Sequence, residues 1–320
     1  MITFDKLSIL VDDCYISNMN EKHFERRTKG RYCLSYTYHQ KFPCHLYIRL
    51  DVEKEILVIE FTSKILSDEA RDLINIDNIR TCLDNINKMG ICELDIDNII
   101  KEGQICKCDV TRDIDFNLAE LPSLLTDIEH SLNNNVRWKC VRYNNGGGIN
   151  GVVIHNSATT RKHKSRLCIY SKSKEFEKIE NSPFLHSLHD RQSFLDYYSN
   201  KLRFELNLIS MSQIRHCLNI ESVDVMSVLG ASPDPNPIYQ FLDKVLVDMP
   251  APLPNLTQRD NERMAVLREN GFDISRVENA VRSIKSPSVA ISRAMKPYRR
   301  LLATVTPPQP TKRMLLGMVA

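Results

Sequence analysis

The sequence contains no stretch of about 18 uncharged apolar residues, so it predicts no membrane-spanning helix. Its first residues lack the basic-then-apolar pattern of a secretory signal peptide, and we therefore expect a cytoplasmic protein. None of the 10 cysteines forms a Cys-x-x-Cys pair, which argues against a structural zinc site. In a cytoplasmic chain these cysteines favour reduced thiols over disulfides.

Charge of one sign is also scarce, because the net charge of the 320 residues is only +3. The basic residues are unevenly distributed, however. Residues 255–320 contain 12 Lys and Arg against 5 Asp and Glu, a surplus of 7. A near-neutral core followed by a basic region suits a nucleic-acid partner. The alternative is a solvated helix face without a binding role.

Hairpin-like segments and helical segments are mixed along the first two thirds of the chain. This order predicts an α+β fold, a largely antiparallel sheet with helices on one face, followed by a smaller helical C-terminal domain. Three prolines between 233 and 237 suit neither a helix nor a central strand, and they indicate a linker. We therefore expect a nicking and strand-transfer domain at 1–232, a helical, DNA-binding domain at 233–305 and a flexible tail at 306–320.

The local patterns predict individual elements. Strands are expected at 45–50, 56–61, 105–110, 136–143, 152–155, 166–170 and 202–208, and helices at 68–89, 121–132 and around 194. A Gly-rich stretch near 146 predicts a hairpin turn, and helices are also expected at 238–247, 259–269, 275–284 and 289–302.

Alternation within three strands separates polar from apolar side chains. In 202–208 every second residue is apolar, and the other face carries Arg203, Glu205 and Asn207. Asp109 shares its strand face with Lys107, Thr111 and Asp113, while Tyr170 shares its face with Arg166 and Cys168. The pattern is typical either of a solvated sheet face or of a functional site built on that face.

The segment Ile169-Tyr170-Ser171-Lys172-Ser173-Lys174-Glu175 resembles the active-site motif of rolling-circle replication initiators, the filamentous phage gene II proteins and the trans-acting plasmid initiators. In that motif an apolar strand ends in Tyr, with Lys two residues later and Glu five residues later. Three more blocks resemble the gene II type in the same order: Ile105–Thr111, Lys201–Glu205 and Val58–Leu66. The resemblance covers roughly residues 45–215.

This resemblance implies a metal-dependent, site-specific endonuclease and strand transferase. Tyr170 is its expected nucleophile, forming a 5′-phosphotyrosine link and freeing a 3′ hydroxyl that primes replication. A phenol with a pKa of about 10 needs help to attack, which Lys172, Lys174 or a metal ion would provide. Mg²⁺ or Mn²⁺ prefers oxygen ligands. The expected metal ligands are Asp109, Glu205 and Glu175, the last only if a helix begins after Ser171.

Basic residues around the nucleophile are expected to bind the DNA backbone. These residues are Arg161, Lys162, Lys164, Arg166, Lys174 and Arg203. The histidines do not form a His-x-His pair, and we interpret His45, His155 and His163 as ordinary polar residues. The roles of Asp113 and Glu60 stay open, and residues 263–285 resemble a helix-turn-helix only weakly.

Other functions fit part of the pattern. Tyr197 and Tyr198 are the rival nucleophiles, although helical packing suits them better. A conjugative relaxase or single-strand transposase would use the same chemistry. A regulator that binds DNA without cutting it would use only the C-terminal domain and the basic loop. The replication hypothesis implies origin DNA, single-stranded or supercoiled, a host helicase and a polymerase as partners.

Overall fold

The computed structural model describes residues 1–29, 32–132, 138–145, 148–156, 164–247, 256–284, 291–304 and 311–320. The chain divides into two compact units. One comprises Met1–Leu118 and Val141–Ile238, and the other comprises Ala119–Cys140 and Tyr239–Ala320. The expected domain order was linear, whereas the second unit also includes a segment from the middle of the chain.

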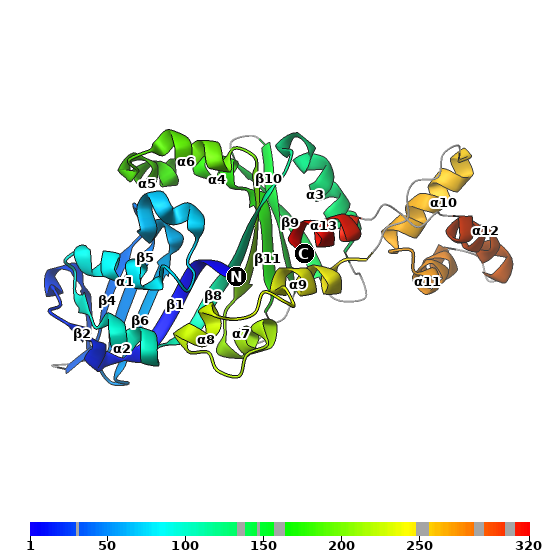
Figure 1. Cartoon of the computed structure of the whole chain (residues 1–320). Coiled ribbons are helices and arrows are strands. Elements are labelled where there is room, and N and C mark those ends of the chain that lie inside the picture. The colour runs from blue at the N-terminus through cyan, green and yellow to red at the C-terminus, as the bar shows by residue number, and fades with distance from the viewer. Residues whose placement is uncertain are drawn as a thin grey trace. The chain divides into compact units, whose positions relative to one another are not determined.

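A ten-stranded sheet dominates the first unit (Figure 1). Its strand order is β3-β4-β5-β6-β1-β8-β12-β11-β10-β9. All paired strands from β3 to β10 run antiparallel, as the α+β prediction requires. The bounds are β1 Thr3–Asp12, β3 Glu25–Lys29, β4 Tyr32–Gln40, β5 Leu46–Asp51, β6 Ile56–Thr62, β8 Gln104–Asp115, β9 Trp138–Asn145, β10 Gly148–Asn156, β11 Arg166–Ser171 and β12 Lys201–Leu208. Two short strands, β2 Ile16–Ser17 and β7 Glu93–Leu94, pair separately.

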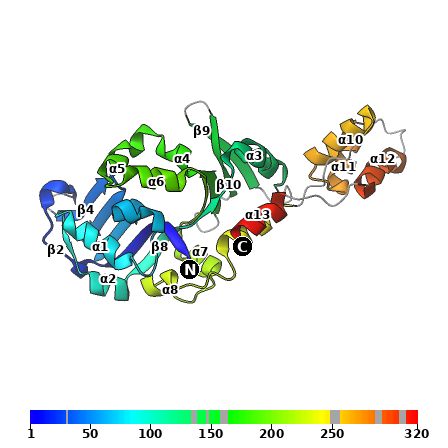
Figure 2. The same ribbon diagram turned by 45° about the horizontal axis from the view of Figure 1, so that its top comes forward.

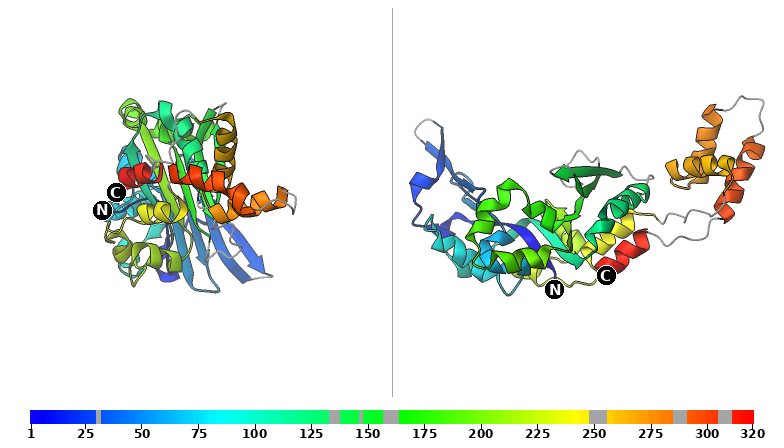
Figure 3. Two further views of the ribbon diagram at one scale, coloured as in Figure 1. Left: turned by 90° about the vertical axis from the view of Figure 1, so that its right-hand side faces the viewer. Right: turned by 90° about the horizontal axis from the view of Figure 1, so that it is seen from above.

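The two faces of this sheet differ in chemistry because side chains alternate along each strand. Leu202, Phe204, Leu206 and Leu208 of β12 are all buried on one face, as their alternation predicts. We call the opposite face, which carries Asp109, Tyr170 and Glu205, the polar face. Figure 3 shows the strands following one another across the sheet, from the N-terminal strands in blue to β10 in green.

Short helices cover the apolar face. They include α2 (Ile96–Glu102), α7 (Met211–Leu218) and α8 (Val225–Leu229), while α1 (Ile79–Lys88) lies beside α2. A further group comprises α4 (Lys172–Phe176), α5 (Ser182–Ser187) and α6 (Arg191–Tyr198), which lie together at one end of the sheet (Figures 1 and 2). Phe176, Phe184, Phe194 and Tyr198 form the core of this group.

The helix expected at 68–89 is divided into two elements. A 3₁₀ segment, η3 (Ser63–Asp72), precedes α1, and Leu73 between them has a positive φ of 56°. The Asn75 side chain accepts hydrogen bonds from the backbone of Asp77 and Asn78. Such local bonds from asparagine compete with helical hydrogen bonding, and the intervening residues form a turn instead. Gly90 follows α1 with φ of 69°, the left-handed conformation that commonly ends a helix.

The second unit is helical. It includes α3 (Leu121–His130), which has Pro122 in its first turn, α10 (Gln258–Glu269), α11 (Ile274–Ile284) and α12 (Ile291–Thr304). The helix α9 (Pro237–Val245) begins at the last proline of the expected linker. Met264, Leu267, Val277 and Met295 form a core among α10, α11 and α12 (Figure 2).

Part of the expected flexible tail is helical. Residues 311–319 form α13 (Thr311–Val319), and Leu315 and Val319 are fully buried there. The apolar spacing of these two residues, four apart, places them on one helix face that packs against protein. The sequence interpretation gave too much weight to the prolines at 307, 308 and 310, which precede the helix.

Trp138, the only tryptophan of the sequence, packs edge-to-face on Phe241, with 5.2 Å between ring centroids. The cysteines in the structure are free thiols. Among the described residues, no helix combines the length and the apolar character that crossing a membrane requires.

Gly103 closes α2 tightly against the sheet, which generates a stability prediction. A Cβ at this position would clash with the backbone oxygen of Ile99 and would lie 2.8 Å from Ile9 Cγ2 and 3.3 Å from Val225 Cγ2. We expect Gly103→Ala to lower the free energy of unfolding by about 1–3 kcal/mol, because these core atoms must move. Urea denaturation followed by circular dichroism measures the change.

Gly317→Ala in α13 is the matched control, since a Cβ there meets no atom within 4 Å. It should leave stability unchanged or raise it by up to about 1 kcal/mol through helix propensity. Equal stability of the Gly103→Ala variant and the wild type would contradict the tight packing of α2.

Candidate active site

Tyr170 lies on the polar face near the end of β11, between two paired strands. Its neighbour across β12 is Arg203, and its neighbour across β10 is Gly151. The hydroxyl of Tyr170 donates a hydrogen bond to Glu205 Oε1 over 2.5 Å. Burial, followed by the negative charge of Glu205, raises the pKa of Tyr170 well above its ordinary value. The resting side chain is therefore a protonated phenol whose proton already points at a carboxylate.

Glu205 and Asp109 are carboxylates with raised pKa values. Burial, followed by repulsion from Asp5, raises the pKa of Glu205 to about 7 against the attraction of Lys172 and Arg203. Burial also raises the pKa of Asp109 to about 6, although the Asn207 side chain donates a hydrogen bond to it. Both side chains come from the polar face, as alternation predicts. Perturbed carboxylates of this kind are typical of functional sites.

Arg203 corrects one sequence expectation. We expected it to bind DNA, but its side chain is only 1% exposed. Its Nε and Nη2 donate to the two oxygens of Asp113, each over 2.6 Å, and its Nη1 donates to Asp5 Oδ1 over 2.8 Å. The Tyr198 hydroxyl accepts a further bond over 3.3 Å. Arg203 is therefore a structural cation of the site, and Asp113 is its bidentate partner.

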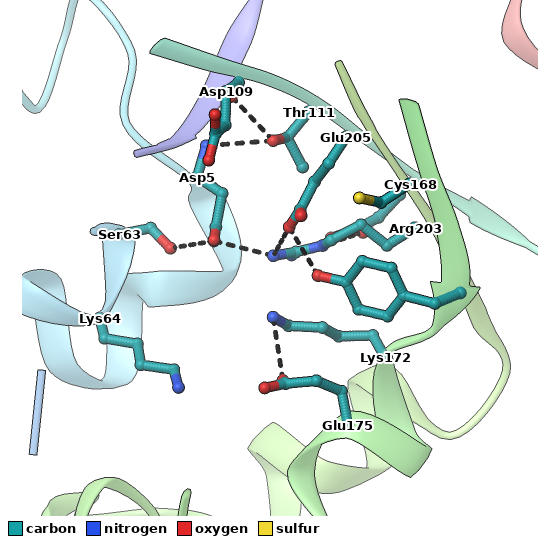
Figure 4. Close-up of polar contacts among 12 residues, drawn as sticks. Asp5, Ser63, Lys64, Asp109, Thr111, Cys168, Lys172, Glu175, Arg203 and Glu205 are labelled. Carbon is teal, nitrogen blue, oxygen red and sulfur yellow. Dashed lines mark hydrogen bonds and ion pairs between the residues drawn. The ribbon is translucent and has the colours of Figure 1, made fainter. Parts of the chain in front are cut away.

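Asp5 is a site residue that sequence reasoning missed. It stands at an irregularity in the pairing of β1 with β8, where its backbone N–H donates to Thr111 Oγ1 over 3.1 Å. Its carboxylate also accepts a bond from Ser63 Oγ over 2.7 Å (Figure 4). Burial disfavours the charged form, but Lys172 and Arg203 together hold the pKa of Asp5 well below its usual range. Leu7, Ile9 and Val11 alternate as in a strand, but the alternation does not extend to Asp5 and so does not assign its side chain to a face.

Lys172 and Glu175 enter the site because a helix begins directly after β11. Ser171 caps α4 with its side chain, which accepts a hydrogen bond from the backbone of Lys174. Lys172 is 4% exposed, and its Nζ lies 3.2 Å from Glu175 Oε2 and 5.7 Å from the centre of the Tyr170 ring. The expected turn into a helix after Ser171 is thus present.

Glu175 lies among positive groups rather than among carboxylates (Figure 4). Its Oε1 accepts a hydrogen bond from Asn181 over 2.9 Å, and Asn181 in turn accepts one from Lys64 over 2.5 Å. Burial raises its pKa, but Lys172 and Lys64 outweigh burial and lower the value to about 2. Lys64 and Asn181 are further residues that sequence reasoning did not assign to the site.

Exposed basic side chains lie on the same sheet face, closer to the start of β11. Lys164 and Arg166 line a cavity beside Asp109, and His155 lies in its wall. Lys174 is half exposed and lies 3.7 Å from Glu177. Arg161, Lys162 and His163 lie outside the described residues.

Glu60, whose role stayed open, forms ion pairs with three basic side chains further along the polar face. Its carboxylate lies 2.7 Å from Lys6, 2.9 Å from Lys107 and 3.1 Å from His45. His45 is therefore an ordinary polar residue in the sense of the sequence interpretation, with a structural partner. The rival Tyr197 lies with its ring over Lys201, 4.9 Å from Nζ, and packs edge-to-face on Tyr198.

Within the described part of the chain, no group of three or more His, Cys, Asp and Glu side chains is arranged to hold a metal ion. The pair that comes nearest to the expected ligand set is Asp109 and Glu205, which lie on paired strands two residues apart in register. Glu175, the third expected ligand, has cations as its neighbours.

Comparisons with known proteins match part of the chain. Residues 79–226 match the family model for the N-terminal part of a phage replication-associated protein, the gene II protein. A search of curated proteins finds no match. Among solved structures, a rolling-circle replication initiator protein from Geobacillus stearothermophilus matches with 14% identity and a TM-score of 0.38, over 80% of this chain and 89% of that one. That score is too low for an element-by-element comparison.

The matched segment contains α1, the strands β8 to β12 and α4, and with them Tyr170, Asp109 and Glu205. It includes the Tyr-x-Lys-x-x-Glu motif and two of the three further blocks on which the resemblance rests. The resemblance to the gene II type is thereby confirmed: over residues 79–226 this chain is similar to the phage replication-associated proteins of that type.

Proposed function

We propose that this protein nicks one DNA strand at a replication origin and becomes linked to the new 5′ phosphate through Tyr170. The freed 3′ hydroxyl would prime synthesis by a host polymerase, with a host helicase opening the duplex. The single observation that supports this proposal best is the 2.5 Å hydrogen bond from the Tyr170 hydroxyl to Glu205, inside a polar site with buried cations.

Glu205 is the proton acceptor in this proposal. Since the pKa of Tyr170 is raised, the phenol keeps its proton until it attacks, and the acceptor must already be in place. The proton passes to Glu205 as the phenol oxygen bonds to phosphorus. The bond from phosphorus to the 3′ oxygen breaks, and that oxygen takes a proton from solvent. The reverse sequence rejoins the strand, because the phosphotyrosine link conserves the bond.

Lys172 is the proposed partner of the negative charge that develops at the phosphate. It is buried beside Tyr170 and forms an ion pair with Glu175. A cation held in a site with little water interacts strongly with charge that forms during the reaction. Glu175 and Asn181 orient Lys172 and Lys64, which makes Glu175 a positioning residue in this account rather than a metal ligand.

A divalent cation fits the pair Asp109 and Glu205. The raised pKa values of these two buried carboxylates mean that neighbouring positive groups do not offset the cost of their ionisation, which a bound cation would do. Mg²⁺ commonly binds proteins through one or two carboxylates and completes its shell with water and phosphate oxygens. When bound, Mg²⁺ or Mn²⁺ would polarise the scissile phosphate. Asp109 is the ligand that this proposal depends on most, because Glu205 also accepts the tyrosine proton.

The nucleophile assignment predicts the outcome of a nicking assay. Supercoiled plasmid carrying the origin, incubated with Mg²⁺ or Mn²⁺, should yield nicked circles with covalently bound protein. Tyr170→Phe should form no detectable adduct, since it lacks the attacking oxygen. Glu205→Gln should slow cleavage by about 100-fold or more, as is typical when a general base is lost. A denaturing gel of the labelled plasmid measures both.

Tyr197→Phe and Glu177→Gln are the matched controls, because they remove a nearby phenol hydroxyl and an exposed carboxylate that directly follows α4. Both should nick at the wild-type rate. An adduct that persists in Tyr170→Phe and disappears in Tyr197→Phe would contradict the assignment. Nicking that continues in a chelator would remove the metal from the proposal, and binding without nicking would indicate a regulator.

The carboxylate pair also predicts how stability changes with pH in the metal-free protein. The folded pKa of Asp109 lies above its ordinary value, so its protonated form is favoured by folding. Its contribution to stability is complete below about pH 4 and is lost as the pH rises through about 6. In a chelator, Asp109→Asn should therefore melt about 5 °C above the wild type at pH 8 and show a smaller difference at pH 5.

Adding Mg²⁺ at pH 8 should raise the melting temperature of the wild type and leave that of Asp109→Asn nearly unchanged. Asp115→Asn, at the exposed end of the same strand, is the control and should gain nothing at pH 8 in the chelator. Melting curves that are identical for Asp109→Asn and the wild type, with and without Mg²⁺, would exclude the proposed pair as a cation site.

A further inference from the structure

A cavity of about 670 Å³ opens on the polar face next to Asp109. Arg166 of β11, Asn207 of β12 and Asp109 of β8 line it, and they lie side by side because they are paired across these three strands. The proposed attack on DNA takes place at Tyr170, which is paired with Arg203 at the other end of β11. Apart from Asp109, the proposed reaction therefore assigns no role to the residues that line this cavity.

Basic residues outnumber acidic ones in the cavity lining. Lys6, Lys107, Lys164 and Arg166 line it, against the one carboxylate of Asp109. Lys6 and Lys107 share the single negative charge of Glu60, so their pair retains a net positive charge. Lys164 and Arg166 are exposed and add two further positive charges. Such a concentration of positive charge attracts phosphate groups.

The remaining wall of the cavity suits a nucleobase. Val153 of β10 and Ile209, which follows β12, provide apolar surface, and Asn207 provides an amide. Ligand sites are commonly concave, mostly apolar and equipped with a few polar groups that fix orientation. A cavity whose lining combines cations, apolar side chains and an amide has groups that suit the phosphate, the base face and the base edge of a nucleotide.

The distance to the nucleophile fits a continuous DNA strand. Arg166 precedes Tyr170 by four residues on β11, which corresponds to about 13 Å along the strand. Each nucleotide of a stacked strand advances about 3.4 Å along the helix axis, and extension of the strand lengthens that advance. A strand whose scissile phosphate lies at Tyr170 would reach the cavity within a few nucleotides.

We propose that this cavity binds one unpaired nucleotide of the strand that is cut, a few nucleotides from the scissile phosphate. Lys164 and Arg166 contact its phosphate, Val153 and Ile209 pack on its base, and Asn207 faces the base edge. The inference rests on the proposed function for the identity of the strand, but it concerns binding alone. The cavity thereby gives the site a base preference next to the cut.

The test measures binding without cleavage. Fluorescein-labelled hexamers of dT, dA, dC and dG are titrated with the Tyr170→Phe protein in a chelator, and anisotropy reports the affinity. We expect the four hexamers to differ by about 5-fold or more, since base contacts discriminate by about 1–3 kcal/mol. Arg166→Gln should weaken the binding of all four hexamers by about 5-fold or more. It should also reduce the slope of the logarithm of the affinity against the logarithm of the salt concentration by about 1.

Val153→Trp, which fills the cavity without changing charge, should abolish the differences among the hexamers. Lys101→Gln on α2 is the charge control, since Lys101 is exposed on a helix that covers the opposite face, and it should bind like the parent. Circular dichroism melts test whether each variant is folded. If Val153→Trp does not fold, the Arg166→Gln result alone decides the proposal. Equal affinities for the four hexamers in the parent, or an Arg166→Gln variant that binds like Lys101→Gln, would overturn the proposal.

The two proposals fail separately in this design. If the cavity binds nucleotides as described but no adduct forms on supercoiled plasmid, the proposed nicking reaction is wrong while the cavity stands. If the adduct forms on Tyr170 but the variants bind all hexamers alike, the nicking reaction stands and the nucleotide cavity is wrong.

Discussion

Tyr170 stands opposite Arg203, and Arg203 stands opposite Asp113, because β11, β12 and β8 pair in antiparallel register. Glu205 follows Arg203 by two residues on the same face of β12, and its Oε1 lies 2.5 Å from the tyrosine hydroxyl. A slip of one residue in any of these strands would turn its polar side chains to the apolar face. The wholly apolar alternate residues of β12 prevent such a slip, since they would have to leave the core.

The buried charges of the site depend on one another. Arg203 is fully surrounded by protein and is compensated by Asp113 and Asp5. Removing one partner of a buried ion pair leaves an uncompensated charge, which is strongly destabilising. Asp5 stays ionised in this arrangement, and its charge helps to raise the pKa of Glu205. The network that stabilises Arg203 therefore also prepares Glu205 to accept a proton near neutral pH.

Strand alternation predicted a large part of this arrangement. The apolar face of β12 and the shared face of Asp109, Thr111 and Asp113 follow from a period of two, and both are confirmed. Alternation assigns side chains to faces, but it does not tell which of them are covered. For that reason Arg203 was expected at the DNA and is in fact buried beneath α6, bonded to Tyr198.

The sequence patterns did not predict the contacts between segments that lie far apart in the sequence. Asp5 lies at an irregularity of β1, where the two-residue period is interrupted, and its role follows only from the pairing of β1 with β8. Lys64 and Asn181 meet across 117 positions of sequence. The helix expected at 68–89 is interrupted because Asn75 and Asn78 form local hydrogen bonds that no periodic pattern reveals.

The central claim is that the Tyr170 oxygen becomes bonded to DNA, and peptide mapping of the covalent complex tests it most directly. Trypsin cleaves after Arg166 and Lys172, so Tyr170 lies in the peptide Leu167–Lys172. After nuclease digestion of the complex, mass spectrometry should find this peptide with the added mass of a 5′-linked nucleotide. A nucleotide on the peptide that contains Tyr197 and Tyr198, with Leu167–Lys172 unmodified, would contradict the account.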